Sequence, residues 1–317
     1  MKAPINVLYI AGSGRSGSTL LDRVLGQAPE MTSLGEMRYL WSFGLLDNNL
    51  CECGHPFRQC PFWSEVTRAA LGSPDRGDLE RTSRISRRLD RTPAIPRVLG
   101  WLPRAPGQPR AEIEAHVETL ARVYRAVSER AGTPWLVDSS KAPAYGFLIA
   151  RIPGIRLHVL HLVRDSRAVC HSWQRKRRRP EVTAGTVYMP QRAALATAVR
   201  WDYGNLLDQA LGRAADGYLR LRYEDFVASP VQSVNRIRVA LGLPGDATDG
   251  FLTDRAVDMS PSHTLAGNPS RFATGVIRFR LDDVWRSELS SARFALVTLV
   301  TLPQLLYYGY RLSRRGR

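Results

Sequence analysis

Residues Ile5 to Arg23 read INVLYIAGSGRSGSTLLDR. An apolar run is followed at once by a loop with three glycines, after which apolar residues recur at helical spacing. This order predicts a strand, a glycine-rich loop and a helix. Such a loop turns its backbone N–H groups toward an anion, and the helix directs its first N–H groups and the positive end of its dipole to the same place. The alternative is a tight turn that needs glycine only for its backbone angles.

The spacing of the glycines nearly fits a Walker A motif, but Ser18 stands where that motif requires lysine. Within the loop the cation is Arg15, three residues before Ser18. Because a nucleoside triphosphate site uses the missing lysine at the β- and γ-phosphates, this loop favours a shorter anion, such as one 5′-phosphate carrying one further group. The main alternative is a P-loop kinase or nucleotide hydrolase, in which Asp138, at the end of the apolar stretch WLVD, binds Mg²⁺.

The length and composition predict one domain with insertions, because 317 residues with 44% hydrophobic content can bury one sizeable core. The formal net charge is +16, and nearly all the cations are arginines; the lysines are Lys2, Lys141 and Lys176. A positive field suits an anionic cofactor or substrate, or an anionic membrane surface. A basic module that binds nucleic acid or a membrane surface is therefore a further alternative, but it gives the glycine-rich loop no role.

Further apolar stretches alternate with helical patterns and predict an α/β fold, with a P-loop-type parallel sheet flanked by helices. Residues 29–34 are expected to be a connector. The other predicted strands are residues 135–138, 155–163 and 218–223.

Polar residues follow the predicted strands, and ligands bind at the C-terminal ends of strands in open α/β sheets. Lys141 and Arg164 follow two of these strands. Ser172, eight residues beyond Arg164, is expected to lie on a helix that converges on the same anion. Glu36 opens a helical segment near the glycine-rich loop, where the alternative is an ordinary acid favoured by the helix dipole.

Residues 47–110 are expected to be an insertion that forms a lid or a wall of the substrate site, since arginine, proline and glycine dominate its second half. Its first part contains Cys51, Cys53, His55 and Cys60. Three thiols and one imidazole can bind a structural zinc ion, although Cys-x-Cys is tighter than the spacing of common zinc modules. Buried thiols or a reversible disulfide are the alternatives.

Residues 294–310 are apolar and near the roughly 17 to 25 residues that span a bilayer, but Pro303, Gln304 and tyrosines interrupt them. We expect a buried C-terminal helix that covers the sheet; the alternative is peripheral membrane contact, helped by the arginines of residues 314–317. The N-terminal apolar run is too short for a secretory signal, and the four cysteines do not make a disulfide framework of the secreted type. The expected location is cytoplasmic.

Taken together, these motifs resemble those of the sulfotransferases that use 3′-phosphoadenosine-5′-phosphosulfate (PAPS). Residues 15–21 look like the family's 5′-phosphosulfate loop, residues 163–168 with Ser172 look like its 3′-phosphate site, and residues 223–226 resemble a third shared block whose tyrosine lies beside the cofactor. The resemblance covers most of the chain outside residues 76–110. It implies that these residues bind the cofactor: Arg15, Ser16, Gly17, Ser18, Thr19, Leu20, Arg164, Ser172 and Tyr223.

The likeness is greatest to the branch that contains protein-tyrosine sulfotransferases and many bacterial relatives. In that branch a glutamate 21 residues beyond the loop arginine acts as general base, which implies this role for Glu36. A lysine in a segment like residues 140–143 stabilises the transferring group, which implies that role for Lys141. The resemblance also implies cofactor contacts for Lys176, four residues beyond the serine, and for Arg271, in a loop like the one that closes over the 3′-phosphate. Candidates for the support of Arg271 are Ser260, Ser262 and His263.

The resemblance implies an enzyme that moves a sulfuryl group from PAPS to an acceptor hydroxyl by in-line transfer. A sulfuryl group carries less charge than a phosphoryl group, so no metal ion is required at the reaction centre. We expect the acceptor to be a small molecule or a carbohydrate rather than a protein tyrosine, and we expect no nucleic-acid partner. A cysteine-containing insertion occurs among bacterial relatives without a metal role that the chemistry requires, which weakens the zinc interpretation.

Overall fold

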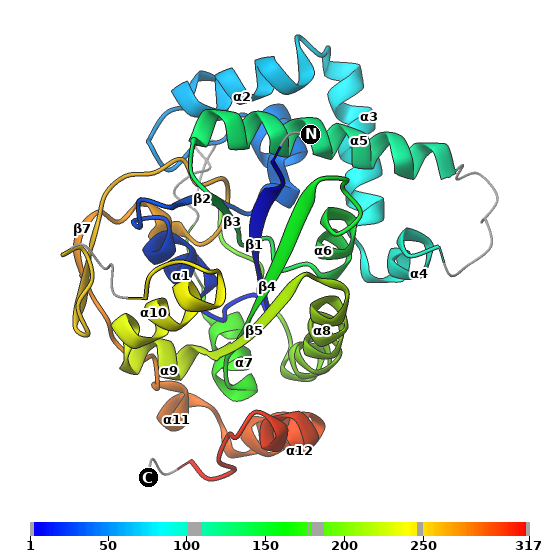
Figure 1. Cartoon of the computed structure of the whole chain (residues 1–317). Coiled ribbons are helices and arrows are strands. Elements are labelled where there is room, and N and C mark those ends of the chain that lie inside the picture. Colours follow the sequence, from blue (N-terminus) through cyan, green and yellow to red (C-terminus); the bar gives the residue numbers. More distant parts are fainter. Residues whose placement is uncertain (1–2, 101–109, 177, 179–186, 246–249, 315–317) are drawn as a thin grey trace.

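The computed structural model describes residues 3–100, 110–176, 178, 187–245 and 250–314. At its centre is a sheet of five parallel strands in the spatial order β2-β3-β1-β4-β5 (Figure 1). The predicted α/β class with a parallel sheet is therefore confirmed. The strands are β1 (Ile5–Ala11), β2 (Met31–Gly35), β3 (Trp135–Asp138), β4 (Ile155–Val163) and β5 (Gly217–Arg222).

β1 lies in the middle of the sheet and is covered on both faces. Successive side chains of a strand point to opposite faces. Val7, Tyr9 and Ala11 belong to one core cluster, whereas Leu8 and Ile10 belong to another. An apolar run of this kind is typical of a parallel strand with helices on both sides. The helices of the first cluster include α5 (Arg110–Ala131), α6 (Pro143–Ile149) and α8 (Ala194–Ala214), and those of the second include α1 (Ser18–Leu25), α9 (Tyr223–Ala228) and α10 (Pro230–Ala240) (Figure 1).

The prediction of a connector over residues 29–34 is wrong, because β2 occupies most of that segment. β2 pairs with β3, about a hundred residues later in the chain, so no local pattern indicates the pairing. After β2 the chain forms a 3₁₀-helix, η1 (Met37–Tyr39), and a π-helix, η2 (Leu40–Leu46). Glu36 immediately precedes η1, as its predicted place at a helix start requires.

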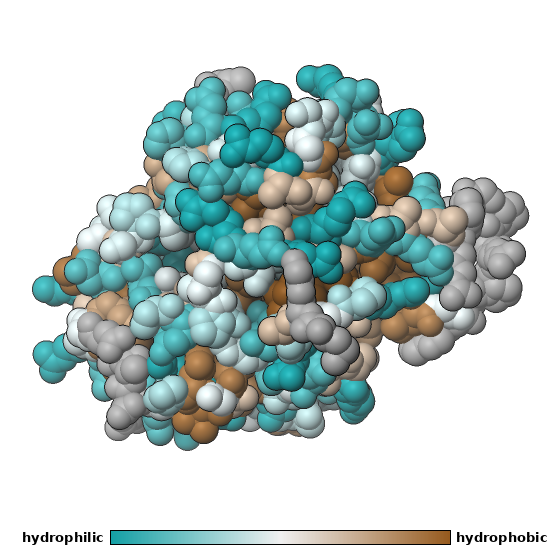
Figure 2. All heavy atoms as spheres, turned by 45° about the horizontal axis from the view of Figure 1, so that its top comes forward, coloured by the Kyte–Doolittle hydropathy of each residue, from teal (hydrophilic) through white to brown (hydrophobic). Residues whose placement is uncertain are grey.

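The predicted insertion is mainly helical. α2 (Pro61–Leu71) and α3 (Arg76–Leu89) pack against α5, and α3 also contacts η2, so they share the core of the domain (Figure 1). The face of the molecule that includes this layer is largely hydrophilic, with smaller hydrophobic areas (Figure 2). Residues 101–109 of the predicted lid lie outside the described residues. The elements are η3 (Phe57–Gln59), α2 (Pro61–Leu71), α3 (Arg76–Leu89), η4 (Thr92–Ala94) and α4 (Ile95–Val98).

The predicted C-terminal helix is α12 (Ser291–Tyr307). It packs on α8 and on α7 (Ser166–Gln174). Its C-terminal end also meets the sheet, as predicted, because the ring centre of Tyr307 lies 4.9 Å from the Arg220 guanidinium of β5, and Leu305 shares a core cluster with Val163 of β4. Val297 and Leu305 are buried, whereas Leu299 is 73% exposed. In the part of the chain that the structure describes, no helix is both long and apolar enough to cross a membrane. Residues 315–317 lie outside the described residues. The other C-terminal elements are β6 (Ala256–Met259), η5 (Pro269–Phe272), β7 (Gly275–Arg278) and α11 (Trp285–Glu288).

Candidate active site

Residues that follow the five strands form the candidate site. Because the strands are parallel, their C-terminal ends share one edge of the sheet. The glycine-rich loop follows β1, Glu36 follows β2 and Lys141 comes shortly after β3. Arg164 follows β4, and Tyr223 follows β5. The topology therefore places five of the predicted features at this edge.

The glycine-rich loop fits closely between its neighbours. Gly17 has a φ of +90°, and a Cβ at this position would lie 2.4 Å from the ring of Tyr223, so only glycine is accommodated here. Gly17 precedes α1 and offers no side chain to cap its first N–H groups. The buried hydroxyl of Ser16 finds no hydrogen-bond partner among the described residues. A helix start without a side-chain cap, together with a buried hydroxyl, fits an anion in this loop.

An ion pair stands beside the loop. Lys141 Nζ lies 2.8 Å from Glu36 Oε1, and the two side chains are 11% and 13% exposed. Glu36 and Thr19 border Gly267, because a Cβ added there would lie 3.4 Å from Thr19 Oγ1 and 3.7 Å from Glu36 Oε1. The backbone N–H of Asn268 donates to Thr19 Oγ1 at 3.3 Å. A carboxylate, an ammonium group and a loop hydroxyl thus meet in one partly enclosed place.

The backbone around Lys141 directs its side chain toward Glu36. Lys141 has a φ of +59°, in the left-handed region that is unusual for a lysine. Asp138 Oδ1 accepts hydrogen bonds from the backbone N–H and the hydroxyl of Ser140, and Tyr9 exchanges hydrogen bonds with the backbone of Ala142. These contacts fix the chain on both sides of Lys141. Such conformations persist where the surroundings impose them, often at functional sites.

Arg164 borders the loop on the side of β4. Its guanidinium donates to the Arg15 carbonyl at 2.9 Å and lies 4.6 Å from the ring centre of Tyr223. The same guanidinium meets the carboxylate of Asp282 at 3.2 Å. Arg164 is only 6% exposed, whereas the Asp282 side chain is 28% exposed. The Asp282 carboxylate thus occupies one side of Arg164, the residue predicted to bind the 3′-phosphate.

α7 connects the Arg164 region to the loop through Trp173. The indole N–H of Trp173 donates to the Gly14 carbonyl at 3.1 Å, and its ring lies 5.0 Å from the Arg15 guanidinium. Ser172, the preceding residue, is buried near this contact. Lys176 is exposed and its ammonium group lies 4.4 Å from the ring centre of Tyr188, so its described contact is with Tyr188 rather than with the loop.

The contacts that the structure gives for Arg271 lie on the β2 side of the sheet. Arg271 is buried on η5, donates to the Leu50 carbonyl at 3.1 Å and lies 5.5 Å from the ring centre of Phe43. Leu50 and Phe43 belong to the segment after β2, and three strand spacings of about 4.8 Å each separate β2 from β4. Arg271 therefore contacts the cysteine-containing loop, which lies between η2 and η3 and includes Leu50. The motif around Arg271 did not indicate this position.

Asp22, on α1, makes the stability of this region sensitive to pH. Burial outweighs the charge of Lys141 and raises the pKa of Asp22 to about 8. Between about pH 4 and pH 8 the folded chain therefore holds a proton on Asp22 that the unfolded chain releases, and the contribution of Asp22 to stability falls as pH rises. We expect the stability of Asp22→Asn relative to wild type to rise over this range, by at most about 1.4 kcal/mol per pH unit.

Urea unfolding at several pH values measures this difference, with the exposed Asp47→Asn as the control. A stability difference between Asp22→Asn and wild type that stays constant from pH 5 to pH 8 would contradict the assignment.

The parallel sheet, the glycine-rich loop after its first strand and the residues at its C-terminal edge define a P-loop-like α/β protein. Comparison with known families then gives the finer identity. The profile described as "Sulfotransferase family" matches residues 8–247, and the chain belongs to that family.

Solved structures with the same fold include two sulfotransferase domains. One, from the olefin synthase of Synechococcus PCC 7002, has a TM-score of 0.55 at 21% identity, and the match covers 99% of this chain and 98% of that domain. The other, from the curacin biosynthetic pathway, has a TM-score of 0.53 at 16% identity, over 98% of this chain and all of that domain. No curated protein sequence matches the chain at the significance required. The predicted family and fold are thus confirmed.

Proposed function

We propose that the protein transfers a sulfuryl group from PAPS to an acceptor hydroxyl. Membership of the sulfotransferase family supports transfer of this group. The observation that carries the residue assignment is the Glu36–Lys141 pair beside the glycine-rich loop, at 2.8 Å. A base for the acceptor and a cation for the developing negative charge are thereby next to the anion-binding segment.

The residues around the loop fit a nucleotide with phosphates at both its 5′ and 3′ positions. Backbone N–H groups of residues 17–19 and the Ser16 hydroxyl would hold the 5′ group, since the N–H groups of Ser16 and Leu20 already donate within the loop. Arg164 and Ser172 would hold the 3′-phosphate, and Tyr223 would lie between the two sites, since it contacts both Gly17 and Arg164. We assign Arg271 a positioning role at the cysteine-containing loop.

Three side chains would carry the chemistry. When bound, the nucleotide supplies the sulfuryl group and a leaving phosphate. Glu36 would accept the proton of the acceptor hydroxyl. General-base catalysis of this kind accelerates a reaction about 10²- to 10⁴-fold. Lys141 and the hydroxyl of Thr19 would donate hydrogen bonds to the oxygens on which negative charge develops. The fixed backbone at Lys141 keeps its ammonium group in place before the reaction, so little reorganisation of this group is needed.

Asp138 does not favour the kinase alternative. It is fully buried, and its two oxygens accept hydrogen bonds from Ser140 and from the hydroxyl of Tyr124. To bind Mg²⁺, the carboxylate of Asp138 would have to give up hydrogen bonds that shape the turn before Lys141. We therefore propose a supporting role for Asp138. As the acceptor we propose the hydroxyl of a small molecule or a carbohydrate.

Asp282 would compete with the 3′-phosphate for Arg164. Its carboxylate also lies 3.7 Å from the Arg175 guanidinium, so it faces two cations. Because a partly exposed ion pair is worth up to about 1 kcal/mol, we expect Asp282→Asn to bind adenosine-3′,5′-bisphosphate up to about fivefold more tightly. Titration calorimetry measures the affinity, and the exposed neighbour in Asp283→Asn is the matched control. Weaker binding by Asp282→Asn would show that the carboxylate supports the site instead.

Transfer itself is tested with PAPS carrying a labelled sulfuryl group. The protein is incubated with this donor and with separate sets of alcohols, phenols and sugars, and the labelled products are separated. We expect label in at least one set, and a rate of labelling at least about a hundredfold lower when Glu36→Gln replaces the wild type. Phosphoryl transfer from ATP with Mg²⁺ to the same compounds, without sulfuryl transfer from PAPS, would overturn the proposed function.

A further inference from the structure

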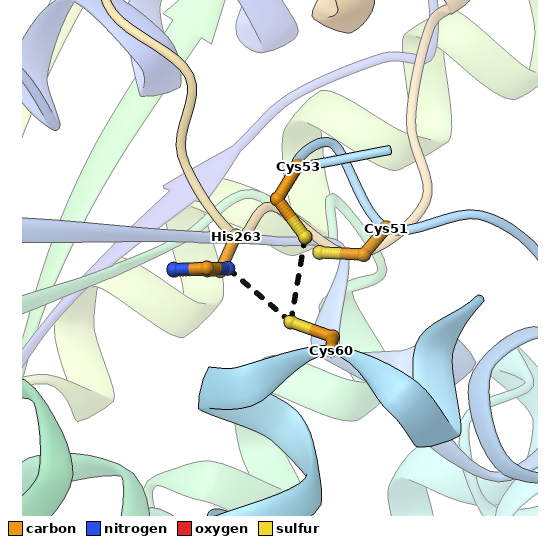
Figure 3. Close-up of side chains that lie close together, drawn as sticks. All are labelled: Cys51, Cys53, Cys60 and His263. Atoms are coloured by element: carbon orange, nitrogen blue, oxygen red, sulfur yellow. Dashed lines mark hydrogen bonds between the residues drawn. The ribbon is translucent and has the colours of Figure 1, made fainter. Parts of the chain in front are cut away.

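Three cysteines and a histidine meet in a place that the proposed reaction does not use. Cys51 and Cys53 come from the loop before η3, Cys60 precedes α2, and His263 comes from the segment after β6. Figure 3 shows the four side chains pointing toward one another. Their candidate ligand atoms all lie within 4.8 Å of one another. Segments about two hundred residues apart thus present four donors to one point.

Two of the separations between these atoms are close to those of a tetrahedral metal site. With Zn–S bonds of about 2.3 Å and Zn–N bonds of about 2.0 Å, the edges of a tetrahedron measure about 3.5 to 3.8 Å. The Cys53 and Cys60 sulfurs are 3.6 Å apart, and Cys60 Sγ lies 3.2 Å from His263 Nδ1. A disulfide would need sulfurs about 2.05 Å apart, and these three cysteines are free thiols.

The surroundings hold the histidine in this orientation. The ring of Phe62 stacks on the His263 ring, with centres 5.3 Å apart and planes 9° from parallel. The indole N–H of Trp63 donates to the His263 carbonyl at 2.7 Å. Cys51 and Cys60 are fully buried. Cys53 and His263 are half-buried. A largely buried site with an oriented imidazole and thiol donors is typical of structural zinc rather than of a hard cation.

The two segments are also joined next to the cluster. Glu52, between the first two cysteines, accepts hydrogen bonds from the hydroxyls of Ser262 and Thr264, which flank the histidine. The same carboxylate forms a buried ion pair with Arg23 of α1, at 2.8 Å. The polar contacts on both sides of His263 therefore fix the approach of its segment to the cysteine loop.

We propose that Cys51, Cys53, Cys60 and His263 bind one structural zinc ion. The ion would link the cysteine-containing loop to the segment after β6, which continues from His263 toward Gly267 beside the proposed base. Two residues after His263, Leu265 exchanges backbone hydrogen bonds with Leu34 and Glu36, at 2.8 and 2.7 Å. The chain then reaches Gly267, beside Thr19 and Glu36. The zinc site would thereby position the backbone that carries the proposed base, without touching the substrate.

The fourth ligand differs from the one that the sequence indicated. His55 is near the cysteines in the chain, and its Nδ1 lies 3.7 Å from Cys53 Sγ, yet it does not belong to the group of four. His263 is 203 residues from Cys60, so no local motif could reveal it. This difference supplies a matched pair of variants, His263→Ala and His55→Ala.

Metal content of the full-length protein tests the site. The chain is purified without a metal-affinity tag, and zinc is measured by plasma mass spectrometry. We expect about one zinc ion per chain in the wild type, in His55→Ala and in Cys170→Ser, whose thiol lies outside the cluster, and at least a fivefold loss in His263→Ala. This readout does not depend on whether the chain transfers sulfuryl groups.

Replacement of the metal by Co²⁺ in the wild type guards against a variant that fails to fold. Tetrahedral thiolate coordination predicts intense visible bands and a thiolate charge-transfer band in the near ultraviolet. Less than about 0.1 metal ion per wild-type chain, a disulfide among the three cysteines, or loss of zinc in His55→Ala but not in His263→Ala would overturn the proposal.

Discussion

Glu36→Gln is expected to lower kcat by about 10²- to 10⁴-fold, because the amide cannot accept the proton of the acceptor hydroxyl. The change conserves the size of the side chain and leaves an oxygen that can accept from Lys141 Nζ, now 2.8 Å from the carboxylate. The affinity for adenosine-3′,5′-bisphosphate should therefore change little. Initial rates of sulfuryl transfer give kcat, and titration calorimetry gives the affinity.

The control for Glu36→Gln is Glu65→Gln, since Glu65 is an exposed acid paired with Arg130 on the helical layer. It removes the same charge far from the sheet edge and should leave kcat unchanged. A Glu36→Gln variant that retains wild-type kcat would sink the assignment of Glu36 as the base. An equal loss in both variants would point to net charge rather than to proton transfer.

Lys141→Met is expected to lower kcat by about 10²- to 10³-fold, the usual effect of removing one preorganised donor to a developing negative charge. Methionine keeps much of the length and apolar stem of lysine but carries no charge. The backbone contacts of Ser140 and Ala142 remain, so the turn should persist. Single-turnover rates with saturating PAPS separate this effect on chemistry from an effect on binding.

The double variant Glu36→Gln/Lys141→Met shows whether the two residues act together. Groups that act as a unit are strongly non-additive, so the double variant should lose far less than the product of the two single losses. Fully multiplicative losses would mean that the ion pair does not function as a unit.

Strand ends were the most predictable part of the site. β1, β3 and β4 are marked by apolar runs, and β5 by apolar residues that alternate with arginine. Each of these strands places its predicted feature at the shared edge: the loop, Lys141, Arg164 and Tyr223. Glu36 was predicted to lie near the loop from its distance along the chain, although its strand, β2, was not. Because the strands are parallel, their C-terminal ends lie at one edge of the sheet, so residues far apart in the sequence come close together there.

The remaining features depend on contacts that a local pattern cannot contain. His263 joins the cysteines across about two hundred residues, and Asp282 meets Arg164 across 118 residues. Arg271 follows a motif that suggested the 3′-phosphate, yet the structure buries it beside Phe43. The high hydrophobicity of residues 294–310 predicts a buried helix, but α12 packs mainly on other helices and leaves Leu299 exposed. In each case tertiary packing decided the outcome.

The central claim is that the site selects a nucleotide by its 3′-phosphate. Calorimetric affinities for adenosine-3′,5′-bisphosphate and adenosine 5′-phosphate, measured on wild type and on Arg164→Ala, test it most directly. Since hydrogen bonds between charged groups are worth about 1.5 to 3 kcal/mol, the wild type should prefer the bisphosphate by about 10- to 150-fold. The preference should largely disappear in Arg164→Ala. Equal affinities in the wild type, or tighter binding of ATP with Mg²⁺, would contradict the account.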